Sequence, residues 1–179
     1  MRKSIVQSLK ETCMTKRVTE SMLRRWASDE KVGYTTVLGG LCVNFHAESP
    51  AVSLLVRLEE NGRVVRISTL TDATYPLEWS DQLLSLINDY HHQHRWPTVR
   101  LMTEESGCSV RGEHYISAAG GLYQWQLNPM ITNVFVSWVC FVEWLHDHME
   151  ALDADGFSFQ RLNIFGNGLA PVYQLPKRR

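Results

Sequence analysis

The chain has 179 residues, of which 44% are hydrophobic and 21% charged, a composition typical of one globular domain with a single core. Eighteen Lys and Arg residues against nineteen Asp and Glu residues give a formal net charge of −1. Proteins dedicated to nucleic acid usually carry a strong positive charge that displaces counterions. Composition therefore argues against nucleic acid as the partner.

Two features bear on localisation. Residues 1–17 carry charged and polar groups throughout and lack the apolar region of a secretory signal. The most apolar stretch, residues 130–145, contains polar residues and is shorter than the ~20 residues that cross a bilayer. We therefore expect a cytoplasmic protein without a membrane partner. The cysteines form no C-x-x-C pair, and we expect four free thiols, Cys13, Cys42, Cys108 and Cys140.

The first half of the chain predicts a helix followed by strands. Residues 1–17 show no period, and we expect a flexible segment there. Thr19 is a suitable N-cap for a helix over residues 19–31. Alternating apolar residues predict a strand over residues 41–46 and a hairpin of residues 52–58 and 63–70, which turns at Glu60-Asn61-Gly62.

The second half repeats this alternation of helix and strands. A helical period covers residues 78–92, and strands are predicted over residues 96–102 and 108–116. The last helix is expected over residues 128–149, with Asn128 as N-cap and Pro129 at the first helical position. Residues 151–179 show no sustained period and form a tail that can dock on the domain.

The apolar arc of the last helix is wider than one contact face requires. A helix that is apolar around most of its circumference must be covered on two sides, so it lies either centrally or at a subunit contact. For a subunit contact, the expected dimer interface is made by Phe135, Trp138 and Val142.

These elements together predict an α+β fold. The order is α-β-β-β-α-β-β-α, with a single antiparallel five-stranded sheet and helices packed against it, and the domain covers residues 18–150.

Four short stretches carry a resemblance to a known family: Val32-Gly33-Tyr34, Leu86-Ile87-Asn88-Asp89-Tyr90, Arg95-Trp96-Pro97 and Gly120-Gly121-Leu122. Over residues 19–149 the chain resembles the YbjN family of bacterial sensory transduction regulators, whose members look like type III secretion chaperones in fold. The chain departs from the family pattern where His91, His92 and His94 replace a second asparagine. The resemblance implies a homodimeric binding scaffold without enzymatic activity or cofactor.

The residues that could support chemistry have simpler explanations. His91, His92 and His94, with His146 and His148, could bind a metal, but no acidic partner stands at a metal-binding spacing, which favours an exposed polar helix end. Cys108 and His114 are an even number of positions apart on one predicted strand, so their side chains could lie on the same face, yet no nucleophile motif surrounds them. We therefore predict no catalytic residue and no metal. The alternative is a small-molecule or metal-dependent enzyme that uses these residues.

A set of arginines suggests where a partner binds. Several charged residues alternate with the apolar residues of the predicted strands and should therefore face the other side of the sheet. They are Arg57, Arg66, Arg100 and Arg111, together with Glu59 and Glu113. Such a face could receive an acidic peptide, although ordinary cross-strand ion pairs would give the same pattern. We expect these four arginines to contact an unidentified protein partner, and the chain to act as a chaperone-like adaptor or regulator.

Overall fold

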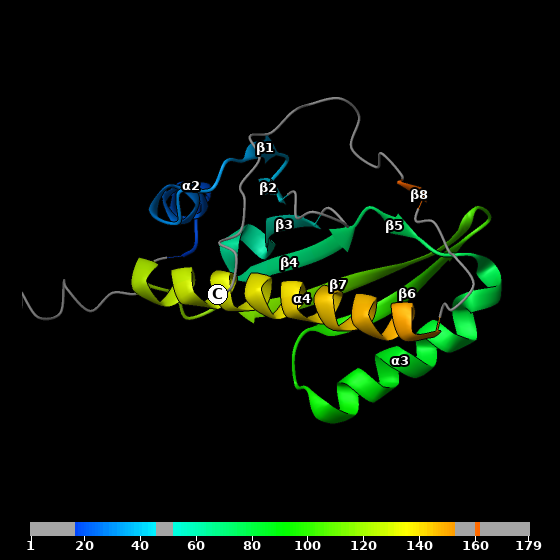
Figure 1. Ribbon diagram of the computed structural model, residues 1–179. Coiled ribbons are helices and arrows are strands. Elements are labelled where there is room, and N and C mark those ends of the chain that lie inside the picture. The colour runs from blue at the N-terminus through cyan, green and yellow to red at the C-terminus, as the bar shows by residue number, and fades with distance from the viewer. Residues whose placement is uncertain (1–16, 46–51, 153–159, 162–179) are drawn as a thin grey trace, which may run out of the picture.

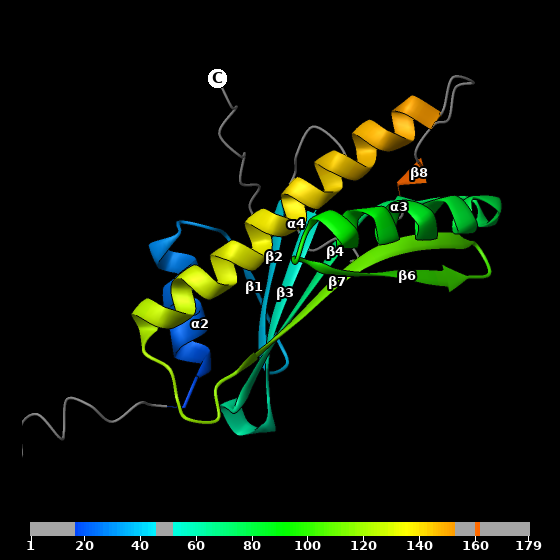
Figure 2. The same ribbon diagram turned by 90° about the horizontal axis from the view of Figure 1, so that it is seen from below.

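The computed structural model describes residues 17–45, 52–152 and 160–161. It contains the helices α2 (Glu20–Asp29), α3 (Ser80–Gln93) and α4 (Gln124–Leu152) and one large antiparallel sheet. Figures 1 and 2 show α3 and α4 along the same face of this sheet, with α2 beside the beginning of α4. The predicted α+β fold is confirmed.

The sheet has six strands instead of the predicted five. They run in the order β1-β2-β3-β4-β7-β6. Their bounds are β1 (Thr35–Val37), β2 (Gly40–Phe45), β3 (Val52–Glu59), β4 (Val64–Thr71), β6 (Thr98–Glu104) and β7 (Gly107–Ser117). The additional strand β1 has three residues and pairs at the edge with β2, where Thr35 lies opposite Cys42.

A second, two-stranded sheet joins β5 (Ala73–Thr74) to β8 (Gln160–Arg161). In this pairing Ala73 lies opposite Arg161. Two residues of the predicted tail therefore dock on the domain. The expected flexible segment before residue 17, residues 153–159 and 162–179 of the tail, and Cys13 lie outside the described residues. Residues 151 and 152 of the predicted tail belong to α4.

The predicted hairpin is confirmed as β3 and β4. The 3₁₀ turn η1 (Glu60–Gly62) connects them, with Asn61 at φ 55° and Gly62 at φ 80°. Left-handed backbone of this kind suits asparagine and glycine. Gly62 also has no room for a side chain, since a Cβ would collide with the carbonyl oxygen of Val18. The turn thus joins β3 to β4 and packs closely against the backbone of Val18, which precedes α2.

The last helix begins earlier than predicted. Helix α4 starts at Gln124, so Pro129 lies inside the helix. The side chain of Gln126 accepts a hydrogen bond from the backbone N–H of Tyr123 at 2.9 Å, and the carbonyl of Tyr123 accepts from the N–H groups of Gln126 and Leu127. This capping arrangement starts the helix five residues before Pro129. The first four backbone N–H groups of a helix have no partner within the helix. Pro129, which has no N–H group, is the sixth residue of α4 and so lies just beyond this first turn.

The core lies between the sheet and the helices. Trp138 is fully buried above Gly112 of β7, where a Cβ would come within 2.7 Å of the indole Cε3. The ring of Phe135 stacks on Phe45 of β2 with centroids 3.9 Å apart. Val142 is 7% exposed. Most of the wide apolar arc of α4 is therefore covered by the chain's own sheet and neighbouring helices, whereas Val136 is 48% exposed.

This packing corrects the expected dimer interface. Phe135, Trp138 and Val142 are all buried within one chain, so a second copy has no access to them in this fold. Of the two positions that the sequence left open for the last helix, the structure has the central one. Among the described residues, no helix combines the length and the apolar character needed to cross a bilayer.

Candidate functional site: an arginine-rich sheet face

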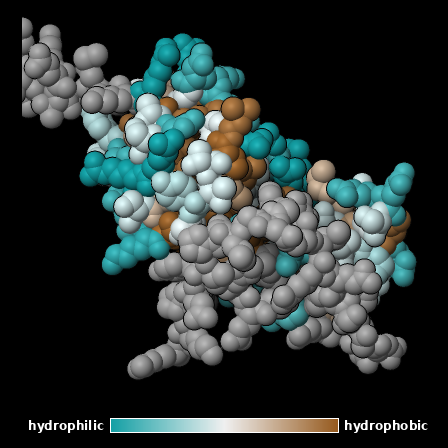
Figure 3. Space-filling view, turned by 90° about the horizontal axis from the view of Figure 1, so that it is seen from above, coloured by the Kyte–Doolittle hydropathy of each residue, from teal (hydrophilic) through white to brown (hydrophobic). Residues whose placement is uncertain are grey.

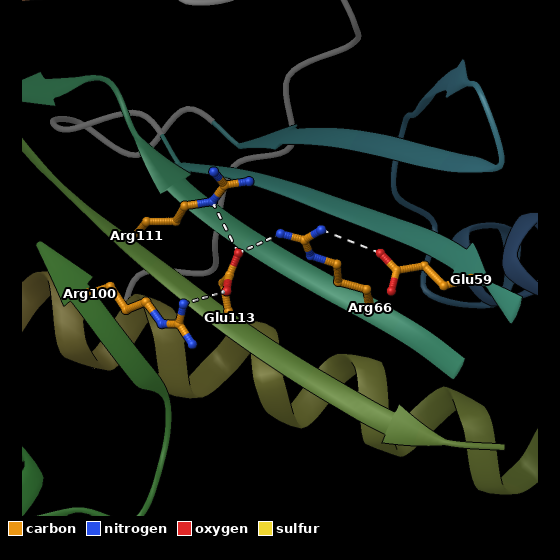
Figure 4. Close-up of polar contacts among 5 residues, drawn as sticks. All are labelled: Glu59, Arg66, Arg100, Arg111 and Glu113. Carbon is orange, nitrogen blue, oxygen red and sulfur yellow. Dashed lines mark hydrogen bonds and ion pairs between the residues drawn. The ribbon is translucent and has the colours of Figure 1, made fainter. Parts of the chain in front are cut away.

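The strand register brings the predicted arginines onto one face of the sheet. Arg57 on β3 lies opposite Arg66 on β4, and Arg111 on β7 lies opposite Arg100 on β6. Figure 4 shows these strands in front of α4, with the side chains of Arg66, Arg100 and Arg111 on the side away from the helix. We call Arg57, Arg66, Arg100 and Arg111, together with Glu59 and Glu113, the arginine face.

Glu113 is the centre of this face. Its side chain is only 8% exposed, and its Oε1 accepts a hydrogen bond from Arg66 Nη2 at 2.6 Å. Its Oε2 lies 3.5 Å from Arg100 Nη1, and its Oε1 lies 3.7 Å from Arg111 Nε. Three guanidinium groups from three strands thus surround one carboxylate.

The protonation states follow from these contacts. The hydrogen bond from Arg66 lowers the pKa of Glu113, and the positive charges of Arg66, Arg111 and Arg100 lower it further, while burial works in the opposite direction. The same hydrogen bond raises the pKa of Arg66. Glu113 is therefore ionised throughout the neutral range.

Arg66 is the most constrained of the four arginines. Besides Glu113, its guanidinium reaches Glu59 Oε1 at 3.3 Å and lies 5.6 Å from the ring centroid of Tyr115. A guanidinium near an aromatic ring is stabilised by the ring quadrupole. Its Nε is buried without a hydrogen-bond partner among the described residues. Arg66 therefore holds the cluster together.

The face carries more positive than negative charge. Four guanidinium groups against two carboxylates leave a formal charge of +2. Arg100 is 62% exposed, and Arg57 is also exposed and makes no ion pair with the described residues. Guanidinium groups form forked hydrogen bonds with carboxylates and phosphates. These two arginines are thus the ones available to an anionic ligand.

Sequence reasoning found the arginines but not their arrangement. Parity along each strand identified which residues share a face. It could not show that Glu113 would be buried among three arginines, because that depends on the register between β4, β7 and β6. Tyr115 was also missed, although it has the same parity as Arg111 and Glu113 and could have been included on that ground.

The Cys108 and His114 pair cannot act as a catalytic dyad. The two residues lie six positions apart on β7, which corresponds to about 20 Å along a strand. The thiol of Cys108 donates to the carbonyl oxygens of Pro76 at 3.3 Å and Tyr75 at 3.6 Å, and burial raises its pKa. Nucleophilic cysteines require the opposite shift. Burial also lowers the pKa of His114, whose ring packs on Trp96.

The histidines near the end of α3 make structural contacts. His91 Nε2 accepts a hydrogen bond from the backbone N–H of Val99 at 3.1 Å, and the His94 ring stacks on Tyr90. The ring of His148 stacks on Trp144. Within the described part of the chain, no group of three histidine, cysteine or acidic side chains is arranged to hold a metal ion.

Exposed apolar residues offer a less specific surface. Figure 3, which views the molecule from the β1 side, shows a band of hydrophobic residues flanked by hydrophilic ones. Leu38, in the turn between β1 and β2, is 95% exposed. Scattered apolar residues are common on protein surfaces. The arginine face is therefore the more specific feature.

The fold and this face define an α+β domain with a large antiparallel sheet that has helices on one side and an arginine cluster on the other. No family model and no curated protein matches the sequence. The solved structures do provide a match: the crystal structure of YbjN from E. coli, described as a "putative transcription regulator", has a TM-score of 0.62 at 11% identity. The match covers 75% of this chain and 96% of YbjN. The chain therefore has a YbjN-like fold.

Proposed function

We propose that the protein is a non-enzymatic regulator or adaptor that binds an acidic segment of another protein on its arginine face. The observation that carries this proposal is the excess charge of +2 on the face, with Arg57 and Arg100 exposed. The YbjN-like fold and the description of YbjN as a regulator support the same class of function. Fold similarity alone is a weak argument for function, so the proposal depends on the site.

A protein partner suits this face better than nucleic acid. The chain has a net charge of −1, so the arginine face is a local positive area on a molecule that does not attract polyanions as a whole. An acidic protein segment needs only a local match of charge. The two classes of partner can be separated in one experiment, described below.

We further propose that the chain forms a homodimer through the outward side of α4. The arginine face is an unsuitable dimer contact, because two-fold symmetry would place one +2 face against another. The first half of α4, residues 124–138, carries no charged residue and exposes apolar side chains on its outward side, with Trp125 at 72% and Val136 at 48% exposure. This surface replaces the interface expected from the sequence.

The partner proposal is tested with charge-neutralising variants of the two exposed arginines. The double variant Arg57→Gln/Arg100→Gln removes both positive charges and leaves the Arg66–Glu113 hydrogen bond in place. The matched control, Arg25→Gln/Arg63→Gln, removes two exposed arginines outside the face. Each protein is immobilised and incubated with a lysate of its native host at increasing salt concentration.

We expect a protein partner to be retained by the wild type and the control and lost from the face variant. The wild-type interaction should weaken as salt rises, because exposed charges are screened. Equal retention by the face variant would exclude this face. Duplex DNA is tested in parallel, and retention of DNA that depends on Arg57 and Arg100 would replace the protein partner with a nucleic acid.

A further inference from the structure

Two arginines of the face are direct neighbours across adjacent strands. Arg100 on β6 lies opposite Arg111 on β7. Side chains at opposite positions of adjacent antiparallel strands have Cβ atoms about 5 Å apart. Both guanidinium groups contact the same carboxylate, that of Glu113, at 3.5 Å from Arg100 and 3.7 Å from Arg111. One carboxylate can therefore reach both arginines at once.

Glu113 occupies little of the hydrogen-bonding capacity of this pair. Its shortest contact, 2.6 Å, goes to Arg66, whereas its distances to Arg100 and Arg111 exceed the roughly 2.7–2.9 Å of a charge-assisted hydrogen bond. A guanidinium group has several N–H donors. The Nε of Arg111 has no hydrogen-bond partner among the described residues. The pair thus retains donors for a second carboxylate.

Glu113 lies deeper in the face than the two arginines. Its side chain is 8% exposed, compared with 28% for Arg111 and 62% for Arg100. Figure 4 shows its carboxylate between the two guanidinium groups. The buried carboxylate therefore holds both arginines in place, while their more exposed atoms face the solvent. Side chains that are already ordered lose less entropy when a ligand binds.

The charge of this cluster favours a carboxylate as the ligand. The guanidinium groups of Arg66, Arg100 and Arg111 against the carboxylates of Glu59 and Glu113 leave a formal charge of +1. Like charges at opposite positions of adjacent strands repel each other, so an anion beside Arg100 and Arg111 is stabilising. One carboxylate would bring the formal charge to zero. A phosphoryl group, with nearly two negative charges, would leave an excess beside the ionised Glu113.

Arg57 is too far away to share this carboxylate. It lies on β3, and the order β3-β4-β7-β6 separates it from Arg100 by about 14 Å across the strands. This distance exceeds the Debye length of about 8 Å at physiological ionic strength. Its cross-strand neighbour Arg66 is already engaged by Glu59 and Glu113.

We infer that Arg100 and Arg111 together bind one carboxylate of the acidic partner segment, with Glu113 as the residue that positions the pair. Arg111 is then a binding residue even though its side chain is less exposed than that of Arg100. This inference rests on the proposed function and identifies the point of the arginine face at which an acidic side chain binds.

The test uses the full chain and two short peptides that differ at one position. One peptide has a glutamate there and the other a glutamine, and both have blocked termini and an otherwise uncharged sequence. The glutamate is thus the only charge. Binding is followed by NMR titration at physiological ionic strength, which detects weak binding and reports the Nε–H signals of individual arginines.

We expect the glutamate peptide, and not the glutamine peptide, to shift the Nε–H signals of Arg100 and Arg111. Arg111→Gln and Arg100→Gln should each weaken binding about tenfold, because each removes charge-assisted hydrogen bonds. Arg57→Gln should change the affinity by less than about twofold, since its charge is screened.

Two further variants check the site. Arg111→Lys keeps the charge without the forked donors and should recover part of the affinity lost in Arg111→Gln. Arg25→Gln, in α2, removes an exposed arginine outside the face and should bind like the wild type. The signals of Arg100 and Arg111 in the wild type provide a reading that does not depend on how any variant folds.

The other outcomes separate the two proposals. Binding that requires Arg57 and Arg100 but not Arg111 would overturn the shared carboxylate site and leave the acidic-partner function in place. Identical behaviour of the two peptides would also overturn this inference. If the variant Arg57→Gln/Arg100→Gln then retained its partner in the lysate experiment, the proposed function would fall as well.

Discussion

The indole of Trp26 donates a hydrogen bond from Nε1 to the hydroxyl of Thr132, 106 residues later in the chain, at 3.1 Å. Trp26 is 2% exposed, and Thr132 in turn donates to Glu30 at 3.0 Å. This short chain of hydrogen bonds attaches α2 to α4. It holds the two helices together at the place where α2 packs against β2.

Replacing Thr132 by valine tests this attachment. Valine keeps the shape of threonine but cannot accept the indole hydrogen, so a buried donor loses its partner. We expect the free energy of unfolding to fall by about 1–3 kcal/mol, measured by chemical denaturation. Thr132→Ser retains the hydroxyl, so its free energy of unfolding should fall by less. An unchanged midpoint for Thr132→Val would show that the hydrogen bond does not stabilise the helix pair.

Gly112 is a second sensitive position. A Cβ at this residue would collide with the Oγ1 of Thr69 and lie 2.7 Å from Cε3 of Trp138. We expect Gly112→Ala to lower the free energy of unfolding by about 1–3 kcal/mol, because the core has no space to absorb a methyl group. Gly120→Ala is the control, since its Cβ would have nothing within 4 Å. Equal stability of the two variants would contradict the packing of α4 on β7.

The pH dependence of stability should report on Glu113. Its pKa is lowered in the folded protein, so it contributes stability above its ordinary value of 4.5, and that contribution is lost as pH falls through the lowered value. We expect Glu113→Gln to be less stable than wild type near pH 7 by about 1–3 kcal/mol. The difference should shrink as the pH falls below 4.5, the ordinary value. A difference that stays constant over this range would contradict the ion pairs.

The proposed dimer is tested on the outward side of α4. Val136→Glu places a charge on a surface that the second copy would cover, so light scattering should give the 20.6 kDa of one chain where the wild type gives twice that mass. Asn88→Glu introduces the same charge at an exposed position of α3 and should leave the dimer intact. A wild-type mass of 20.6 kDa at all concentrations would exclude the dimer.

Local patterns predicted most of the fold. The alternation of Val52, Leu54 and Val56, followed by Glu60-Asn61-Gly62, was enough to predict β3, β4 and their turn. The strand β1 was missed because Thr35-Thr36-Val37 has too few residues to show a period, and its pairing with β2 decides its conformation. The start of α4 was missed because the residue before the helix is Tyr123, whereas Ser, Thr, Asp and Asn are the usual N-cap residues. The backbone N–H of Tyr123 donates instead to the side chain of Gln126.

For the site, the alternation of residues along each strand predicted which side chains share a face but not which of them are in contact. Strand parity placed Arg57, Arg66, Arg100 and Arg111 on one face. The gathering of three of them around Glu113 depends on which strands are neighbours, and the sequence order of β6 and β7 does not reveal that β7 lies next to β4. The subunit contact was assigned to buried residues because a wide apolar arc has the same pattern in a central helix and at an interface.

The position of β7 beside β4 also affects how the chain folds. The strands β1 to β4 form successive neighbours, and β6 with β7 forms a separate hairpin, so each part consists of local contacts. Joining them requires closure of a long loop that contains α3, which costs entropy before the contacts form. Arg66 and Glu113 stand on opposite sides of this join, 47 residues apart. The arginine face therefore comes into existence only when the two halves meet, and its central ion pair marks the completion of the sheet.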